Sequence, residues 1–129
     1  MRAPYQTSEL PDAAEFFAAE RLRWREKKFQ AEVVRQAKDL RWRVYHSYFS
    51  DRSEAGFPDL VLVRERVVYA ELKTMNGRLT DRQRDWIAAL RDAGAEAYVW
   101  RPCCWNADDI LRVLSSSPAA RSCADHLTS

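Results

Sequence analysis

Hydrophobic and polar residues follow two different periods along the chain, and the change of period separates helices from strands. Up to about residue 40 the apolar residues recur at helical spacing, which predicts a helix over about 12–40, broken near Trp24. From residue 41 to 49 aromatic and β-branched residues dominate, which predicts a strand. The apolar stripe of the helical segment consists of Leu22, Phe29, Val33, Ala37 and Leu40.

Cap residues in the second half of the chain predict two more helices. Thr80, with Gln83 three residues later, forms a capping-box pattern, and the helix that it starts is expected to stop at Gly94. Asn106 or Asp108 is expected to cap a last, short helix.

Three further runs have the pattern of strands, at roughly 59–64, 67–73 and 96–101. The resulting order, α-β-β-β-α-β-α, predicts an α/β fold in which a mixed four-stranded sheet is flanked by helices. The first three strands are expected to form an antiparallel meander, and the helix before the last strand allows a parallel crossover. We expect one domain over residues 1–114 and a polar, mobile tail over 115–129.

Composition narrows the class of protein further. A chain of 129 residues that is 47% hydrophobic and has only 3 glycines is neither disordered nor a loop-rich β-sandwich. The longest aliphatic run is too short for a membrane span, and the first residues lack the apolar stretch of a signal peptide, so a cytoplasmic protein is expected. Free thiols are expected, because Cys103 and Cys104 are adjacent instead of spaced as zinc ligands.

Charge is distributed unevenly although the net charge is only +2. Residues 20–43 contain nine basic and four acidic residues, so the first part of the chain has a strong positive excess. A basic face of this kind is typical of proteins that bind the phosphate backbone of nucleic acids. A solvated helix has the same composition, so charge alone leaves both interpretations open.

One segment, GFPDLVLVRERVVYAELKT, has the pattern of a buried β-hairpin and yet carries Asp59, Glu71 and Lys73. Side chains alternate between the two faces of a strand, so Glu71 and Lys73 point to the same side. If Val63 pairs with Val67 across a three-residue loop, Asp59 lies directly opposite Glu71, with Cβ atoms about 5 Å apart. An even loop would bury one charge for no gain, so the odd loop is predicted.

Two carboxylates at this separation repel each other unless a positive charge lies between them. A hard divalent cation such as Mg²⁺ binds carboxylate and carbonyl oxygens and keeps water molecules that an incoming phosphate can replace. Lys73, on the same face, can orient or activate a water molecule, or stabilise the charge that develops on the phosphate. The alternative is a structural salt bridge in which Lys73 neutralises Asp59 or Glu71 at the sheet edge.

Two short motifs, GFPD at 56–59 and ELK at 71–73, resemble those of the PD-(D/E)XK nuclease superfamily. A longer series, GFPDLVLVR, AELKT, GRLTDRQRDWIAALRDAG and AYVWRP, is similar to the VRR-NUC family of virus-type replication-repair nucleases, in its small stand-alone bacterial or phage form. The resemblance extends from about Glu26 to Leu114 and implies a PD-(D/E)XK restriction-endonuclease-like core.

The resemblance implies an endonuclease that hydrolyses DNA phosphodiester bonds with Mg²⁺ or Mn²⁺. Asp59, Glu71 and the backbone carbonyl of Leu72 would bind the metal, and Lys73 would be the catalytic lysine. Stand-alone members are similar to Holliday junction resolvases. This similarity implies a homodimer that acts on branched DNA, such as Holliday junctions or flaps, in repair, recombination or replication.

The family also places a glutamate of the first helix and a glutamine near the metal. Glu26 and Glu32 are the candidates for the glutamate, and at about 100° per residue Glu26 falls inside the apolar stripe while Glu32 falls outside it. Glu26 is therefore expected to face the core or the site. Gln83 could take the place of the glutamine, act as the capping-box partner of Thr80, or do both.

Three basic residues are candidates for phosphate contacts. His46 lies on the Trp42 side of its strand and could reach a phosphate or a metal-bound water, although a histidine satisfied within the sheet face has the same pattern. Arg52 and Arg82 lie in or beside loops that flank the site, with solvated surface charge as the alternative. One position departs from the family: Arg41 precedes Trp42 where a glycine is usual, which affects the helix-to-strand turn and not the chemistry.

Two other functions are compatible with the sequence. A DNA-binding module could keep the nuclease fold without turnover, but a binder has no reason to keep three charges that converge at one place. A purely structural α/β protein would become more stable on neutralising Asp59, since the repulsion from Glu71 would disappear.

Overall fold

The computed structural model of the protein describes residues 12–47 and 54–116. Its elements are, in chain order, α1 (Ala13–Arg21), α2 (Glu26–Asp39), β1 (Arg43–His46), β2 (Leu60–Val63), β3 (Val67–Leu72), α3 (Asp81–Asp92), β4 (Glu96–Trp100), α4 (Pro102–Asn106) and α5 (Asp109–Ser115). The predicted break near Trp24 is confirmed, because α1 and α2 are separate helices. Most of the expected tail, from residue 117 onward, lies outside the described residues.

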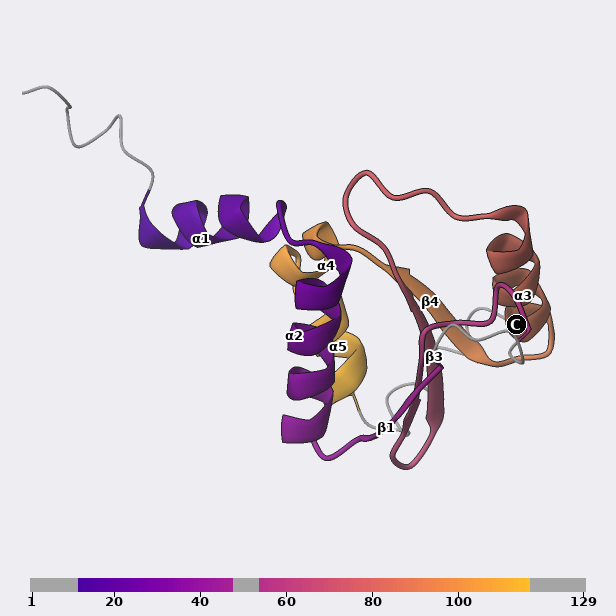
Figure 1. The fold of residues 1–129 in the computed structure, drawn as a ribbon. Coiled ribbons are helices and arrows are strands. Elements are labelled where there is room, and N and C mark those ends of the chain that lie inside the picture. Colours follow the sequence, from indigo (N-terminus) through magenta and orange to yellow (C-terminus); the bar gives the residue numbers. More distant parts are fainter. Residues whose placement is uncertain (1–11, 48–53, 117–129) are drawn as a thin grey trace, which may run out of the picture.

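The four strands form one mixed sheet in the order β1-β2-β3-β4. β1, β2 and β3 are antiparallel neighbours, whereas β4 lies parallel to β3 after the crossover through α3. Figure 1 shows α2 and α5 on one side of the sheet and α3 on the other. The predicted α/β class, the meander and the parallel crossover are confirmed.

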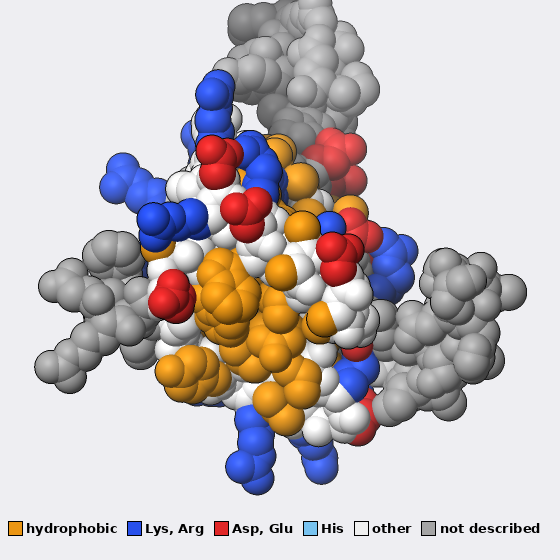
Figure 2. All heavy atoms as spheres, turned by 90° about the vertical axis from the view of Figure 1, so that its right-hand side faces the viewer, with side chains coloured by type: hydrophobic (Ala, Val, Ile, Leu, Met, Phe, Trp, Pro, Cys, Tyr) orange, Lys and Arg blue, Asp and Glu red, His pale blue; other side chains and the backbone are white. Residues whose placement is uncertain are grey.

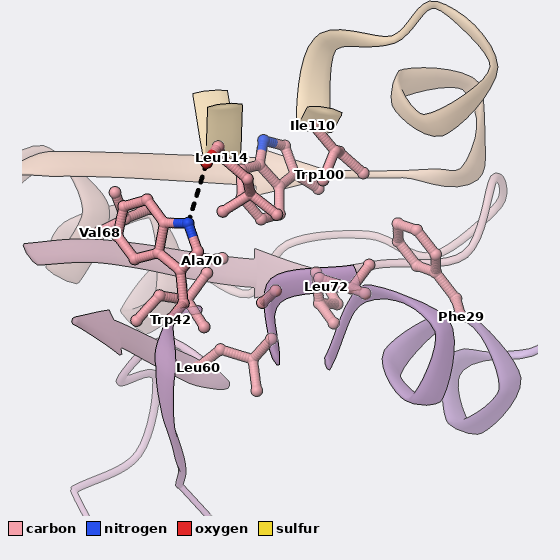
Figure 3. Close-up of a cluster of buried hydrophobic side chains, with 12 residues drawn as sticks. Phe29, Trp42, Leu60, Val68, Ala70, Leu72, Trp100, Ile110 and Leu114 are labelled. Atoms are coloured by element: carbon pink, nitrogen blue, oxygen red, sulfur yellow. Dashed lines mark hydrogen bonds between the residues drawn. The ribbon is translucent and has the colours of Figure 1, made fainter. Parts of the chain in front are cut away.

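The main core fills the space between the sheet and the helices α2 and α5. Every second residue of β2 and β3 faces this side, and these residues are buried together with side chains from both helices (Figure 3). The cluster comprises Phe29, Val33, Ala37, Trp42, Leu60, Leu62, Val68, Ala70, Leu72, Trp100, Ile110 and Leu114. Each large side chain removed from water contributes about 1.5–3 kcal/mol, so this side of the sheet carries the main hydrophobic stabilisation.

The opposite face of the sheet is covered only in part by α3. The ring of Phe57 packs edge-on against both Tyr69 and Trp86, and Ile87 is the buried residue of α3. Figure 2 views this side and shows hydrophobic side chains gathered in its middle, with charged side chains around them. The pairing register places three exposed hydrophobic residues on this face: Tyr45, Val63 and Val67.

Two arginines hold the hairpin between β2 and β3 at its tip. The pairing of Val63 with Val67 confirms the predicted three-residue loop. Arg64 and Arg66 lie over the ring of Trp42, with their guanidinium carbons 4.7 and 5.0 Å from its centroid. The same guanidiniums donate to carbonyl oxygens at the C-terminal end of α5, which have no helical N–H partner. The hairpin register is therefore also tied to elements outside the two strands.

The short helix α4 has no counterpart in the prediction, and Asp108, one of the two predicted cap residues, precedes α5. α4 begins with Pro102, whose missing N–H costs nothing in a first helical turn. Asp108 precedes α5 but has φ 60° and makes no side-chain cap, since a capping side chain requires an extended residue. Asn106 instead bonds to Arg21 and to the carbonyl of Ala18 in α1. Asp108 thus occupies the predicted N-cap position of α5, but its side chain makes no capping hydrogen bond.

No helix in the described ranges has the length and apolar character needed to cross a membrane.

Arg41, which stands where a glycine was expected, adopts the conformation of a glycine. Its φ is 70°, in the left-handed region. Its N–H donates to the carbonyl of Lys38 and the N–H of Trp42 donates to that of Ala37, each at 2.9 Å, which is the Schellman pattern that ends many helices. The turn is therefore preserved, and a side chain in it costs about 1–2 kcal/mol.

Arg41→Gly is expected to stabilise the protein. Relief of about 1–2 kcal/mol of backbone strain exceeds the roughly 0.5–1 kcal/mol of extra chain entropy that a glycine adds to the unfolded state. Thermal unfolding should show a melting temperature a few degrees above that of the wild type. Asp39→Gly, in the last helical position of α2, is the control and should lower it. Equal destabilisation by both substitutions would contradict the account of this turn.

Candidate active site

The two acids of the hairpin meet where β2 begins and β3 ends. The N–H of Asp59 donates to Oε2 of Glu71 at 3.2 Å, and the N–H of Leu72 donates to Oδ2 of Asp59 at 2.9 Å. Each carboxyl group thus accepts a hydrogen bond from the main chain of the other segment. The prediction that Asp59 lies opposite Glu71 is confirmed. The same strand register buries Leu72 on the opposite face of the sheet from Glu71.

The segment before Asp59 is fixed against α3 and β1. Pro58 is buried, and the carbonyl of Asp59 accepts a hydrogen bond from the N–H of Ser47 at 2.8 Å. Gly56 has φ 91°, and a Cβ atom added to it would lie 2.6 Å from the carbonyl carbon of Arg82. A side chain at Gly56 would therefore collide with the first turn of α3, so the close approach of the two segments requires glycine.

Glu71 is buried, with 2% of its surface exposed, and two side chains hold its carboxyl group. The amide of Gln83 donates to Oε1 at 2.8 Å, and the ammonium nitrogen of Lys73 lies 3.9 Å from the same oxygen. The side chain of Gln83 also accepts from the N–H of Thr80 at 2.9 Å, which completes the capping box of α3. Gln83 therefore caps its helix and contacts the acid pair at the same time.

Burial and mutual repulsion disfavour two charges in this pair. Burial, followed by the negative charge of Asp59, raises the pKa of Glu71 to about 8. Burial also raises the pKa of Asp59, while the hydrogen bond from Leu72 and the charge of Lys73 oppose that change. A divalent cation would remove the repulsion and favour the ionised form of both groups.

The donor set suits a hard divalent cation such as Mg²⁺. Two carboxylates at the end of a strand, with the adjacent carbonyl of Leu72, are oxygen ligands of the kind that Mg²⁺ prefers. Among the residues that the structure describes, no group of three His, Cys, Asp or Glu is placed to hold a metal ion. Protein ligands would thus be few, and water or a phosphate oxygen would complete the coordination, as is usual for Mg²⁺.

Two of the remaining candidate residues, Glu26 and Arg82, are exposed in the structure. Glu26 is exposed in the first turn of α2, so the expectation that it faces the core is wrong, and a place near the metal stays a prediction. Arg82 is exposed beside Gln83, where a phosphate contact stays a prediction. Arg52 lies outside the described residues.

His46 lies on the α2 side of the sheet, opposite to the face of Glu71. It pairs with Leu60, and its ring nitrogens lie 2.9 and 2.7 Å from the amide nitrogen of Gln30. Its expected contact with phosphate stays a prediction.

Two residues near the site were not singled out from the sequence. Gln30 lies one helical turn after Glu26 in α2, and its amide contacts the ring of His46. Arg101 follows β4 and bonds to two carbonyl groups of the turn after Lys73. The signal for Gln30 is its four-residue spacing from Glu26. The only signal for Arg101 is its place at the end of a strand parallel to β3.

Comparisons with known proteins agree on one family. The family model described as the VRR-NUC domain matches residues 8–102. A solved structure described as a "VRR_NUC domain protein" matches with a TM-score of 0.53 and 23% identity, over 60% of this chain and 78% of that chain. At that identity the likeness concerns the fold. No curated protein matches this chain.

Without a divalent ion, the stability of the protein is expected to fall as the pH rises from about 5 to about 8. Glu71 ionises near its ordinary value of 4.5 in the unfolded chain but keeps its proton to about pH 8 in the folded protein. The unfolded state therefore binds fewer protons in this window, and the free energy of unfolding decreases with pH. Melting temperatures in EDTA across the window measure the effect.

Two comparisons identify the group responsible. Glu71→Gln should flatten the decrease, since an amide does not titrate. Mg²⁺ should restore stability most strongly above about pH 8, where the ion no longer has to displace a proton. A wild-type profile as flat as that of Glu71→Gln would show that this acid titrates normally.

Proposed function

Since this chain belongs to the VRR-NUC family of nuclease-type, DNA-processing domains, we propose that it is a metal-dependent DNA endonuclease. The observation that carries the proposal is the buried carboxyl group of Glu71, which meets Asp59, Lys73 and Gln83 at one end of the sheet. Buried acids held in this way cost stability, and a structural role alone gives no reason to keep them.

Asp59, Glu71 and the carbonyl of Leu72 are the proposed ligands of Mg²⁺ or Mn²⁺. The family generally uses divalent metals, and the raised pKa of Glu71 is the response expected of a ligand pair in the absence of its cation. When bound, the ion would supply Lewis-acid stabilisation of the charge on the scissile phosphate. Gln83 fixes the orientation of Glu71, because its own carbonyl oxygen is engaged by Thr80 and its amide hydrogens point to the acid.

Lys73 is the proposed catalytic lysine. Its side chain is 16% exposed and its ammonium nitrogen lies 3.9 Å from Oε1 of Glu71, so it is partly open to solvent beside the acid pair. An ammonium group placed there can orient the attacking water and stabilise the negative charge that develops on the phosphate. A partly buried site strengthens both effects, because few water molecules screen the charge.

The basic segment at the start of α2 is the proposed contact for the DNA backbone. Phe29, in the first turns of α2, and Leu72, at the end of β3, belong to the same buried cluster (Figure 3). The proposed contacts are the exposed residues Arg23 and Arg25, just before α2, and Lys27, in its first turn. His46, Arg52, Arg82 and Glu26 remain candidates for further contacts with phosphate or metal.

We propose branched DNA as the substrate and a homodimer as the active form, as the family resemblance implies, in the cytoplasm of a bacterium. Two-fold symmetry would give the dimer two active sites, one for each of the two strands that are cut in a junction. Exposed apolar residues are available for the contact on α1, where Phe16 and Phe17 are half exposed. Light scattering should give twice the chain mass of 15.1 kDa, and a monomer at micromolar concentration would count against the dimer.

The direct test is cleavage of four-way junctions, flaps and linear duplex, with and without Mg²⁺ or Mn²⁺. Wild type should cut only with the metal and prefer branched DNA. Asp59→Asn, Glu71→Gln and Lys73→Ala should each lose about 10²-fold or more in rate. Asp92→Asn, in the exposed last turn of α3, is the charge-matched control and should cut like the wild type.

A DNA-binding module without turnover is the alternative. It would bind junctions with similar strength with and without metal, and no DNA would be cut. Equal rates for wild type and Lys73→Ala would remove the catalytic assignment of the lysine.

A further inference from the structure

The turn that follows β3 lies beside the side chain of Lys73. The N–H of Lys73 donates to the carbonyl of Trp100, the last residue of β4, at 3.0 Å. The chain then turns back, and the N–H of Gly77 donates to the carbonyl of Thr74 at 3.2 Å. A Cβ atom added to Gly77 would lie 3.4 Å from Cδ of Lys73, so the turn lies close along the lysine stem.

Arg101 holds both ends of this turn. Its Nη1 donates to the carbonyl oxygens of Thr74 and Gly77, each at 2.6 Å. One guanidinium nitrogen carries two hydrogens, so it can serve both acceptors. Charge-assisted hydrogen bonds of this kind are about twice as strong as neutral ones. The turn lies beyond the β-ladder, and the hydrogen bonds from Arg101 hold its main chain in place of ladder hydrogen bonds.

Arg101 is placed by the strand that carries it. Trp100 pairs with Leu72 in the parallel ladder, so the residues that follow the two strands leave the sheet side by side. The main chain of Arg101 is also held, because its N–H donates to Sγ of Cys104 at 3.4 Å and α4 starts with the next residue. The main chain of Arg101 is therefore held in place, and its side chain reaches across to the short turn from Thr74 to Gly77.

We infer that Arg101 is a positioning residue of the proposed nuclease site. By clamping the turn from Thr74 to Gly77 over the stem of Lys73, it fixes the ammonium group beside Glu71. Arg101 acts through Lys73, and the inference rests on the proposed function of that lysine. Misplacement of a catalytic group by about 1 Å can cost about 10²-fold in rate, so a small displacement of the turn is sufficient.

The experiment compares Arg101→Ala and Arg101→Lys with Arg91→Ala. Arg91 is the matched control. Its Nε donates to the carbonyl of Ala97 at 2.8 Å, so Arg91 also makes an arginine-to-carbonyl hydrogen bond, but away from Lys73. Three quantities are measured for each variant: kcat and KM on a junction that the wild type cuts with Mg²⁺, amide hydrogen exchange of residues 74–77, and the melting temperature.

Arg101→Ala should lower kcat at least about tenfold, with KM within about twofold, and should speed exchange in the turn. Arg101→Lys should lie between it and the wild type, since an ammonium group keeps the charge but not the planar geometry. Arg91→Ala should change none of these quantities except the melting temperature. A purely structural role would lower the melting temperature of Arg101→Ala and leave the kcat of its folded fraction unchanged, which would overturn the inference.

Failure of the inference is separable from failure of the proposed function. If the wild type cuts and Lys73→Ala does not, but Arg101→Ala cuts like the wild type, only the inference is wrong. If no DNA is cut, the proposed function is wrong. Amide hydrogen exchange of residues 74–77 still tests whether Arg101 holds the turn, and unchanged exchange in Arg101→Ala would overturn the inference. Should Arg101→Ala fail to fold, Arg101→Lys provides the same comparisons.

Discussion

The antiparallel register between β2 and β3 is the constraint on which the rest of the structure depends. Side chains alternate along a strand, so a slip of one residue would turn Glu71 into the core and Leu72 out of it. The register is fixed from both ends of the hairpin. At the tip, Arg64 and Arg66 lie over Trp42, and at the open end the main chain at Asp59 and Leu72 bonds to the opposing carboxyl groups. The acid pair is thus both a product of the register and one of the interactions that hold it.

The two faces of the sheet differ in the kind of residue that they bury. The α2 side is a closed apolar cluster, which carries the main hydrophobic stabilisation of the fold. The α3 side holds the buried acid and exposed hydrophobic residues, and the raised pKa of Glu71 shows that the ionised pair is unfavourable there. Such a separation is expected where a chemical site opposes stability, because strain at the site has to be offset by packing that the site does not disturb.

The sequence was sufficient for features that depend on local periodicity. The parity of the hairpin loop predicts that Asp59 faces Glu71, and the capping-box spacing places Gln83 at the start of α3. The sequence was insufficient where tertiary contacts determine the burial or the backbone conformation of a residue. Glu26 lies on the apolar stripe by its angle, but in the structure it is exposed, in the first turn of α2. Asp108 stands at the N-cap position of α5, but its φ of 60° is incompatible with the extended conformation in which a side chain caps a helix.

The parallel crossover explains why residues far apart in sequence converge at the site. In a parallel pair the C-terminal ends of both strands lie at the same edge of the sheet, so Lys73 after β3 and Arg101 after β4 emerge together. The helix that connects the strands must start at that edge, which brings Gln83 to Glu71. An antiparallel β4 would have carried Arg101 to the opposite edge and left the turn after Lys73 without its clamp. The topology of one connection therefore determines which side chains can share the chemistry of the hairpin.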